Sequence, residues 1–494
     1  MLRSVSVAVL LFQVLFAAGQ REAHRWYFGP DGVGLDFSSC PPTIVVDGNG
    51  AAAFEGSCTI SDPVTGRLLF YTTGNVILNA QHQVMVNGEP SGLLNSMAQN
   101  VIVPLPGSAT RYLVFTPDVQ GGLVVNTDYP NANGLNMAVV DMSLANGSGA
   151  VVEKFIPVRP PPNCEMLTAV RHGNGSDFWL IGHVYGSNQF FVYAITSAGI
   201  SQQPLLQGLG PVIDTPQPGV PDGSNFDAIG NLKASPQGDR LAFTTFYNGR
   251  TAVFDFDPNT GTISNPIALS IGKGGYGVCF SPGGTKLYVT ARDSADYGSM
   301  SDGDLFQFDL TAGSPAAIQA SRYTVYSTSI GGFASMRLGP DQRIYVARAG
   351  LDGSPAGDEF LGVVERPELA GVACGYLHDG LYLNGRRGSW GLNSLYETNG
   401  DCAIISSLPK EPTGGSGISV FPAQGGWRIV WPGEWKATAI DVYDMGGRLR
   451  FSSGTNSSFS ASQFLLPPID PGCYVVLLRS GNELVAQQRA VFLD

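Results

Sequence analysis

Several polar or ionisable side chains stand where they could face the centre of the fold and carry chemistry. Carboxylates, imidazoles, amines and guanidinium groups bind polar ligands or transfer protons when one pocket brings several of them together. Each also has a structural interpretation, as a buried charge with a partner or as part of a solvated loop, and for any single residue this interpretation is favoured. The candidates are Glu165, His183, Lys233 and Arg292, with Asn225 and Asp227 just before a predicted inner strand.

Known catalytic motifs are absent from the sequence. It contains no Gly-x-Ser-x-Gly, no His-Glu-x-x-His and no Walker-type loop. The five histidines are dispersed, and none of the seven cysteines belongs to a Cys-x-x-Cys pair. The glycine-rich run 272–277 lacks a following helix that could hold a phosphate. The sequence therefore identifies no cofactor and no metal site.

Cysteine pairing stays open at the level of sequence. An exported protein can form disulfides, and Cys40 with Cys58 or Cys374 with Cys402 are conceivable pairs. The odd number of cysteines leaves at least one thiol free. Buried, small apolar cysteines with one or two bridges are the favoured interpretation.

A turn followed by an alternating strand recurs along the chain, and this unit must position the candidates. Proline sets the turn, Gly or Asn takes the position with positive φ, and an apolar strand follows. Several copies are about 40 to 50 residues apart, the length of a four-stranded propeller blade. We therefore expect an all-β fold built on a β-propeller of about six to eight blades, with seven favoured. Copies begin at Ser61, Pro106, His172, Ser235, Ser281 and Gly339.

The composition agrees with many short strands. Only 14% of the residues are charged, and the 64 glycines and 33 prolines suit tight turns better than long helices. A hydrophobic content of 43% argues against disorder. The net charge of −12 argues against a nucleic-acid ligand, because phosphates need a basic surface.

The N-terminus has the features of a signal peptide. Arg3 precedes the apolar run 5–18, and small residues at 17–19 place the cleavage before Gln20. No other stretch is long and apolar enough to span a bilayer, so we expect no transmembrane segment in the mature chain.

The mature chain is expected to hold two domains. After the signal peptide (1–19), the propeller domain would cover residues 20–405. The run 406–417 is rich in Gly and Pro and is typical of a flexible linker. Residues 418–494 contain several short strand patterns and predict a small antiparallel, immunoglobulin-like β-sandwich.

The motifs WYFG at 26–29, EGSCTISD at 55–62, LFYTTG at 69–74 and GLN at 391–393 carry a resemblance. They resemble a family of secreted Bacteroidetes propeller proteins over most of residues 25–398. Because many such proteins are known only by their secretion signals, the resemblance implies an architecture more than an activity.

The C-terminal strands carry a second resemblance. The segment IDVYD at 440–444, the turn Gly446-Gly447-Arg448 and the strand start Gly472-Cys473-Tyr474 resemble the type A sorting domain of the type IX secretion system. The family's Pro-Asn-Pro start is only FPA at 421–423, and the chain does not end on a basic residue. The resemblance implies recognition by the outer-membrane translocon after passage through the periplasm. The protein would then be secreted or attached to the cell surface.

Two functions remain open. One is a non-catalytic surface module that binds a glycan, a peptide or a protein through the propeller face. The other is an enzyme, because the Ser-Pro-x-Gly units also resemble lactonase and quinoprotein propellers, which act in the central funnel, usually around a metal. No such set of funnel residues can be carried over one by one, so binding is favoured. Asp293-Ser294-Ala295 also fits the O-glycosylation sequon of these bacteria, which makes Ser294 a candidate for modification.

Overall fold

The structure is a computed structural model that divides into two compact units, Met1–Ile405 and Ser406–Asp494. The expected signal peptide, the expected linker 406–417, Asn225, Ser294 and the turn Gly446-Gly447-Arg448 lie outside the residues that it describes. The described ranges are 21–48, 55–89, 99–117, 133–213, 226–292, 302–350, 357–398, 419–423, 426–431, 437–444, 449–453, 463–467, 472–480 and 483–492.

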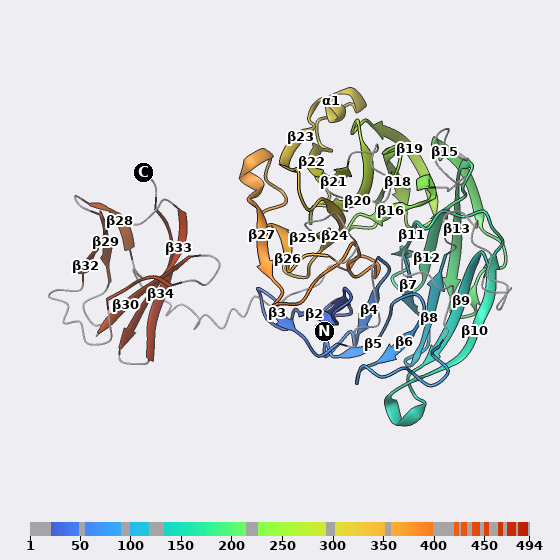
Figure 1. The fold of residues 1–494 in the computed structure, drawn as a ribbon, viewed down its shortest axis with the longest axis horizontal. Coiled ribbons are helices and arrows are strands. Elements are labelled where there is room, and N and C mark those ends of the chain that lie inside the picture. The colour runs from blue at the N-terminus through green and yellow to red at the C-terminus, as the bar shows by residue number, and fades with distance from the viewer. Residues whose placement is uncertain are drawn as a thin grey trace, which may run out of the picture. The chain divides into compact units, whose positions relative to one another are not determined.

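Within the described residues, the first unit contains seven antiparallel sheets that stand around one axis as the blades of a β-propeller (Figure 1). The first two blades hold β1 (Arg25–Phe28), β2 (Val33–Asp36) and β3 (Thr43–Val45), then β4 (Cys58–Ser61), β5 (Leu68–Thr72) and β6 (Ile77–Asn79). The third holds β7 (Val101–Pro104), β8 (Arg111–Thr116), β9 (Leu135–Asp141) and β10 (Ala150–Arg159). The fourth holds β11 (Leu167–Arg171), β12 (Phe178–His183), β13 (Ser187–Thr196), β14 (Gly199–Ile200) and β15 (Leu205–Ile213).

The last three blades have four strands each. They are formed by β16 (Gly230–Ala234), β17 (Arg240–Thr245), β18 (Thr251–Asp257) and β19 (Thr262–Leu269), then by β20 (Gly274–Phe280), β21 (Lys286–Arg292), β22 (Gly303–Asp309) and β23 (Tyr323–Thr328). The seventh holds β24 (Phe333–Leu338), β25 (Ile344–Arg348), β26 (Phe360–Val364) and β27 (Tyr376–Tyr382). Short helices occur at α1 (Pro315–Ala320), η3 (Ala145–Gly147), η5 (Phe226–Ala228) and η6 (Gly371–Cys374). The expected all-β propeller is confirmed, with the favoured number of blades.

The recurring turn works as the sequence predicts. Between β16 and β17, Gly238 has a φ of +71°, which an L side chain would strain. The Ser235 hydroxyl oxygen accepts hydrogen bonds from the backbone N–H groups of Asp239 and Arg240. In the next blade, the Ser281 hydroxyl oxygen accepts one from the N–H of Lys286 in the same way. The serine therefore closes each turn and starts the second strand in register.

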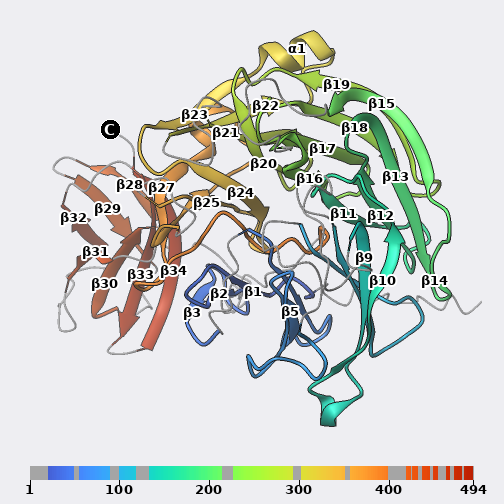
Figure 2. The ribbon, with the colours of Figure 1, turned by 45° about the vertical axis from the view of Figure 1, so that its right-hand side comes forward.

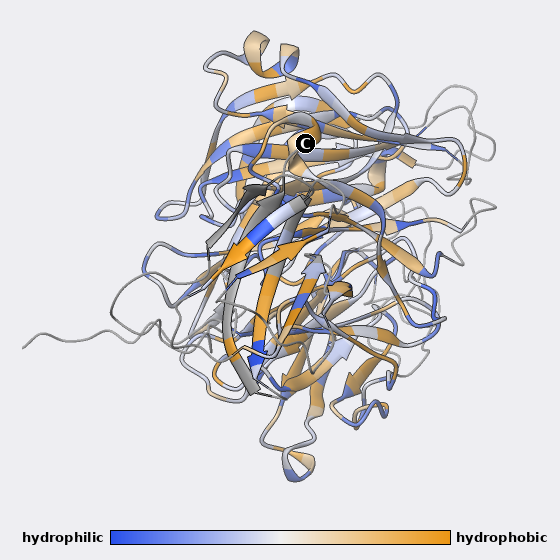
Figure 3. Ribbon diagram, turned by 90° about the vertical axis from the view of Figure 1, so that its left-hand side faces the viewer, coloured by the Kyte–Doolittle hydropathy of each residue, from blue (hydrophilic) through white to orange (hydrophobic). Residues whose placement is uncertain are grey.

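The strands of each blade follow one another outward from the axis (Figures 1 and 2). The first strands β4, β7, β11, β16, β20 and β24 are neighbours around the ring. Apolar side chains fill the space between neighbouring sheets, where Leu180, Leu232, Phe254 and Val289 are fully buried. In Figure 3 the hydrophobic residues follow the strands. Burial of this apolar surface is the main force that holds the blades together.

The ring is closed by the segment 390–397, which lies between β24 and the start of β4. Its residue Asn393 forms a parallel bridge with Ser57. The Asn393 side-chain amide pairs with the backbone of Thr59, as a neighbouring strand would. Its Oδ1 accepts a hydrogen bond from the N–H of Thr59 at 2.9 Å, and its Nδ2 donates one to the Thr59 carbonyl oxygen at 3.3 Å. Residues more than three hundred positions apart thus join the segment after the seventh blade to the first strand of the second blade.

The second unit is a two-layered sandwich, as expected. One sheet has the order β28 (Ser419–Ala423), β29 (Gly426–Val430) and β32 (Gln463–Leu466). The other has the order β31 (Leu449–Ser452), β30 (Ala439–Asp444), β33 (Gly472–Ser480) and β34 (Glu483–Phe492). Its core includes Trp427, Ile440 and Val476. In the segment that resembles a sorting domain, Tyr474 is buried and lies opposite Asp444 in the strand register, and Gly472 lies opposite Phe492.

Both cysteine pairings that the sequence made conceivable are wrong. Cys58 and Cys374 are free thiols in the structure, so neither Cys40–Cys58 nor Cys374–Cys402 forms. Cys40 is disulfide-bonded. Cys58, Cys164, Cys279 and Cys374 are buried, in agreement with the apolar role expected of them. None of the described helices is long and apolar enough to cross a membrane.

Candidate binding site in the propeller axis

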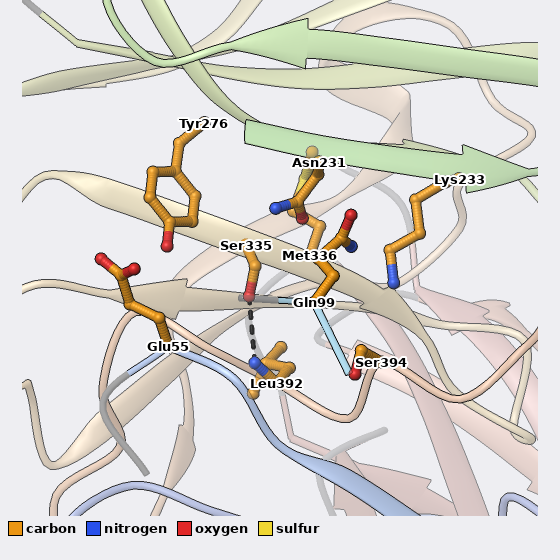
Figure 4. A pocket seen from close by; sticks show the side chains of 9 residues that line it. All are labelled: Glu55, Gln99, Asn231, Lys233, Tyr276, Ser335, Met336, Leu392 and Ser394. Atoms are coloured by element: carbon orange, nitrogen blue, oxygen red, sulfur yellow. Dashed lines mark hydrogen bonds between the residues drawn. The ribbon is translucent and has the colours of Figure 1, made fainter. Parts of the chain in front are cut away.

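A polar pocket lies on the propeller axis, where the first strands of the blades begin (Figure 4). It is narrow and opens onto about 300 Å³ of unfilled space, part of which is open solvent. The lining residues are Glu55, Gln99, Asn231, Lys233, Tyr276, Ser335, Met336, Leu392 and Ser394.

The propeller topology brings these residues together because the first strands of neighbouring blades meet around the axis, and the pocket lies beside those of the second, third, fifth, sixth and seventh blades. Glu55 and Gln99 precede β4 and β7, and Tyr276 lies on β20. Asn231 and Lys233 are two residues apart on β16, so they project from the same face of that strand. The closing segment adds Leu392 and Ser394.

Glu55 and Tyr276 form one end of the pocket. Glu55 is 8% exposed, and its Oε2 is buried without a hydrogen-bond partner among the described residues. The Tyr276 hydroxyl points toward its carboxylate (Figure 4). Burial raises the pKa of Glu55 well above its usual value, the nearby carboxyl of Glu165 raises it further, and Tyr276 acts in the opposite direction. The same burial and the two carboxylates raise the pKa of Tyr276.

Close packing fixes this end of the pocket. The Tyr276 ring meets Phe246 and Trp390 edge to face, with ring centroids 5.9 and 6.0 Å apart. Gly391 approaches Glu55 so closely that a Cβ at this position would stand 1.7 Å from the Glu55 carbonyl oxygen. Only glycine fits there, and the closing segment thereby holds Glu55 in place.

Lys233 forms the other end of the pocket. Its side chain is 5% exposed and makes no hydrogen bond or ion pair with any described residue. Burial lowers the pKa of Lys233 to about 8, and the positive charge of Arg337 lowers it as well, while Glu397 acts in the opposite direction. Arg337 itself is paired, because its Nη1 lies 2.8 Å from Oε1 of Glu397.

Amide and hydroxyl groups lie between the two ends. The side-chain oxygen Oε1 of Gln99 accepts hydrogen bonds from the backbone N–H groups of Leu167 and Leu232, which leaves the side-chain NH₂ group to offer to a ligand. Oδ1 of Asn231 is buried and has no partner among the described residues. The Ser335 hydroxyl oxygen accepts from the N–H of Leu392 at 3.0 Å. The middle of the pocket can therefore both donate and accept hydrogen bonds.

Of the five described candidates from the sequence, only Lys233 lines this pocket. Glu165 is buried beside it and acts on Glu55 and Tyr276 through its charge. Arg292 is buried with its guanidinium 4.1 Å from the centre of the Phe246 ring, outside the lining. Lys233, Glu165 and Arg292 are thus all buried in this part of the propeller, but only Lys233 lines the pocket.

Two of the predicted candidates, Asp227 and His183, make contacts that stabilise the fold and do not line the pocket. Asp227 accepts hydrogen bonds from the backbone N–H groups of Tyr247 and Asn248 and from the Asn248 side chain, so it shapes a loop. His183 packs edge to face on Phe190, and its Nδ1 lies 3.0 Å from the Val184 carbonyl oxygen. Burial lowers the pKa of His183 to about 3, which keeps the ring neutral in the core.

Sequence reasoning missed most of the pocket. Asn231 could have been found, because strand alternation places it on the same face as Lys233. Glu55, Leu392 and Ser394 could not, because they meet only when the chain closes on itself. No group of three or more His, Cys, Asp or Glu side chains within the described ranges could hold a metal ion.

Comparisons with known proteins find no matching protein-family model and no matching curated protein. Among solved structures, a proposed 6-phosphogluconolactonase of Bacteroides uniformis is 12% identical over 94% of this chain and 100% of that protein, with a TM-score of 0.37. The periplasmic gluconolactonase of Pseudomonas aeruginosa is 10% identical over 90% and 99%, with a TM-score of 0.38. The Cps50 (Swd1) propeller domain of Myceliophteria thermophila is 13% identical over 68% and 93%, with a TM-score of 0.37. Likenesses at this level identify neither a substrate nor an activity for this chain.

Proposed function

We propose that this chain is an exported surface protein whose propeller binds a small polar ligand in the axial pocket, without transforming it. One observation carries the proposal. Glu55 and Asn231 each leave a buried oxygen without a partner, and Lys233 lacks an ion-pair partner among the described residues, all in one pocket. Leaving buried polar groups unpaired costs about 1–3 kcal/mol each, and more for charged ones. A bound ligand would offset this cost.

Export is supported by the two ends of the chain. The apolar run 5–18 after Arg3 is typical of a signal peptide, and the segments 440–444 and 472–474 resemble a type IX sorting domain. Delivery by that machinery would place the propeller outside the cell, where the pocket meets solutes of the surroundings.

A lactonase-like enzyme is the second candidate, and the titratable groups favour it. Glu55 has a raised pKa and Lys233 a lowered one, and groups shifted in this way inside one pocket are typical of acid–base sites. A carboxylic acid and a neutral amine can donate and accept the protons that opening of a lactone ring requires.

Thermal unfolding of the mature chain in the presence of a panel of small polar solutes tests the binding proposal. A solute that binds the folded state raises the melting temperature with its concentration. We expect at least one such solute, and Lys233→Met should abolish its effect. The matched control is Lys286→Met, which removes a lysine paired with Asp309 at 3.0 Å outside the pocket.

Two outcomes would overturn the proposal. One is a panel in which no solute shifts the melting temperature. The other is a shift that Lys233→Met and Asn231→Leu leave unchanged, because the solute would then bind elsewhere. Release of acid from lactones, lost in Glu55→Gln, would move the enzyme ahead of the binding module, and repeating the assay with a chelator shows whether a metal takes part.

A further inference from the structure

We infer that the ligand of the axial pocket is a small zwitterion, with its cationic group at the Glu55 end and its anionic group at the Lys233 end. This inference rests on the proposed function and specifies the ligand class for the same pocket. A free amino acid, or a molecule of similar size with an amine and a carboxylate, has the required chemistry.

The two charged ends are separated in space. Figure 4 shows Glu55 and Tyr276 together on one side of the pocket and Lys233 on the opposite side, with Asn231 and Ser335 between them. No ion pair joins Glu55 to Lys233.

The Glu55 end attracts a cation. Besides burial, the carboxyl group of Glu165 raises the pKa of Glu55, and no lysine or arginine charge lowers it. An ammonium group placed at Oε2 of Glu55 would supply the missing donor and the missing positive charge.

The Lys233 end attracts an anion. The nearby carboxylate of Glu397 is already paired with Arg337 at 2.8 Å, so it does not form an ion pair with Lys233. The Lys233 ammonium group remains as the positive charge without a partner among the described residues. A carboxylate in contact with it would form a buried ion pair and raise its pKa.

A ligand with one charge would satisfy only half of the pocket. An amine would leave Lys233 unpaired, and a carboxylate would leave Glu55 unpaired. A neutral polyol would satisfy neither charge. Because buried ionisable groups without a partner are costly, whether they stay charged or are held in the neutral form, the pocket discriminates against all three in favour of a zwitterion.

Calorimetric titration of the mature chain with matched compounds tests the inference. Glycine, β-alanine, γ-aminobutyrate and 5-aminovalerate vary the distance between the two charges, whereas butylamine, butyrate and 1,4-butanediol carry one charge or none. We expect one zwitterion to bind at least about tenfold more tightly than every singly charged or neutral probe, a difference of about 1.4 kcal/mol.

Two variants assign the ends. Lys233→Met should reduce binding of the preferred zwitterion to that of butylamine, and Glu55→Gln should reduce it to that of butyrate. Lys286→Met should change neither value, and the melting temperature of each variant shows that it folds.

The results separate this inference from the proposed function. If 1,4-butanediol or a sugar binds at least as tightly as the zwitterions and Asn231→Leu weakens it, the pocket binds a ligand and the zwitterion assignment is wrong. If no probe and no solute of the wider panel binds, both proposals are wrong. Equal zwitterion binding by wild type and both variants would also contradict the assignment, because the probe would occupy another site.

Discussion

Glu55 and Lys233 lie at opposite ends of one axial pocket, both buried and neither in an ion pair with a described residue. Burial of an ionisable group without a partner is unfavourable for folding, whether the group stays charged or is held in its neutral form. A pocket that keeps two such groups therefore reduces the stability of the propeller, as functional sites often do. This relationship leads to predictions on stability as well as on binding.

Lys233→Met should stabilise the propeller at pH 7 in the absence of ligand. The pKa of Lys233 falls from 10.5 to about 8 on folding. A difference of one pKa unit between the folded and unfolded states corresponds to about 1.4 kcal/mol. The free energy of unfolding of the variant should therefore exceed that of the wild type by up to about 3 kcal/mol. Urea denaturation followed by tryptophan fluorescence measures the difference. Lys286→Met, which breaks an ion pair instead, should not be stabilising.

The advantage of Lys233→Met should disappear at high pH. Between pH 8 and 10.5 the unfolded chain binds the Lys233 proton and the folded chain does not. The free energy of unfolding of the wild type therefore rises with pH in this window relative to the variant. The two curves should be farthest apart below pH 8 and should meet near pH 10.5. A gap that stays constant over this window would mean that folding does not desolvate the ammonium group.

Closure of the ring should depend on the buried pair of Arg337 and Glu397. Nη1 of Arg337 lies 2.8 Å from Oε1 of Glu397 and also donates to the Leu395 carbonyl, so it fastens the closing segment to β24. Arg337→Met leaves the Glu397 carboxylate without its partner and should lower the free energy of unfolding by about 3–5 kcal/mol. The double variant Arg337→Met/Glu397→Leu should recover part of this loss, since no uncompensated charge remains. No recovery would show that the carbonyl contacts, not the ion pair, stabilise the closure.

Gly391→Ala should impair both stability and binding. The added Cβ would stand 1.7 Å from the Glu55 carbonyl oxygen, so the closing segment or Glu55 must move. We expect a lower melting temperature and at least about tenfold weaker binding of the preferred zwitterion, because a displacement of about 1 Å is enough to disrupt a polar site. Gly208→Ala is the matched control, since its Cβ would meet nothing closer than 3.3 Å. Unchanged binding by Gly391→Ala would show that the position of Glu55 does not matter.

The propeller could be predicted from the sequence because its repeating unit is local. Ser235, Pro236 and Gly238 form their turn with neighbours a few residues away, and the strand that follows alternates. A repeat length of about 40 to 50 residues is then enough to suggest the blades. The sandwich was predicted for the same reason, from short strands between turns.

The pocket could be predicted only in part because it is not local. Glu55 acquires its role from Gly391 and from a strand of another blade, and no spacing along the chain indicates these contacts. Asp227 and His183 have side chains suited to chemistry, but their neighbours use them for a loop and for the core. These candidates were chosen by residue type, and only their positions in the folded structure show which of them line the pocket.

Carbamylation of lysines by cyanate, followed by mass spectrometry, tests most directly whether the axial pocket admits and holds a ligand. Cyanate is small and reacts with uncharged amines, so Lys233 with a pKa of about 8 should react faster at pH 8 than the ion-paired Lys286. Saturation with the zwitterion that binds most tightly should slow modification of Lys233 at least about tenfold and leave Lys286 unaffected. A Lys233 that stays unmodified in the folded protein, or that reacts equally fast with and without the zwitterion, would contradict the account.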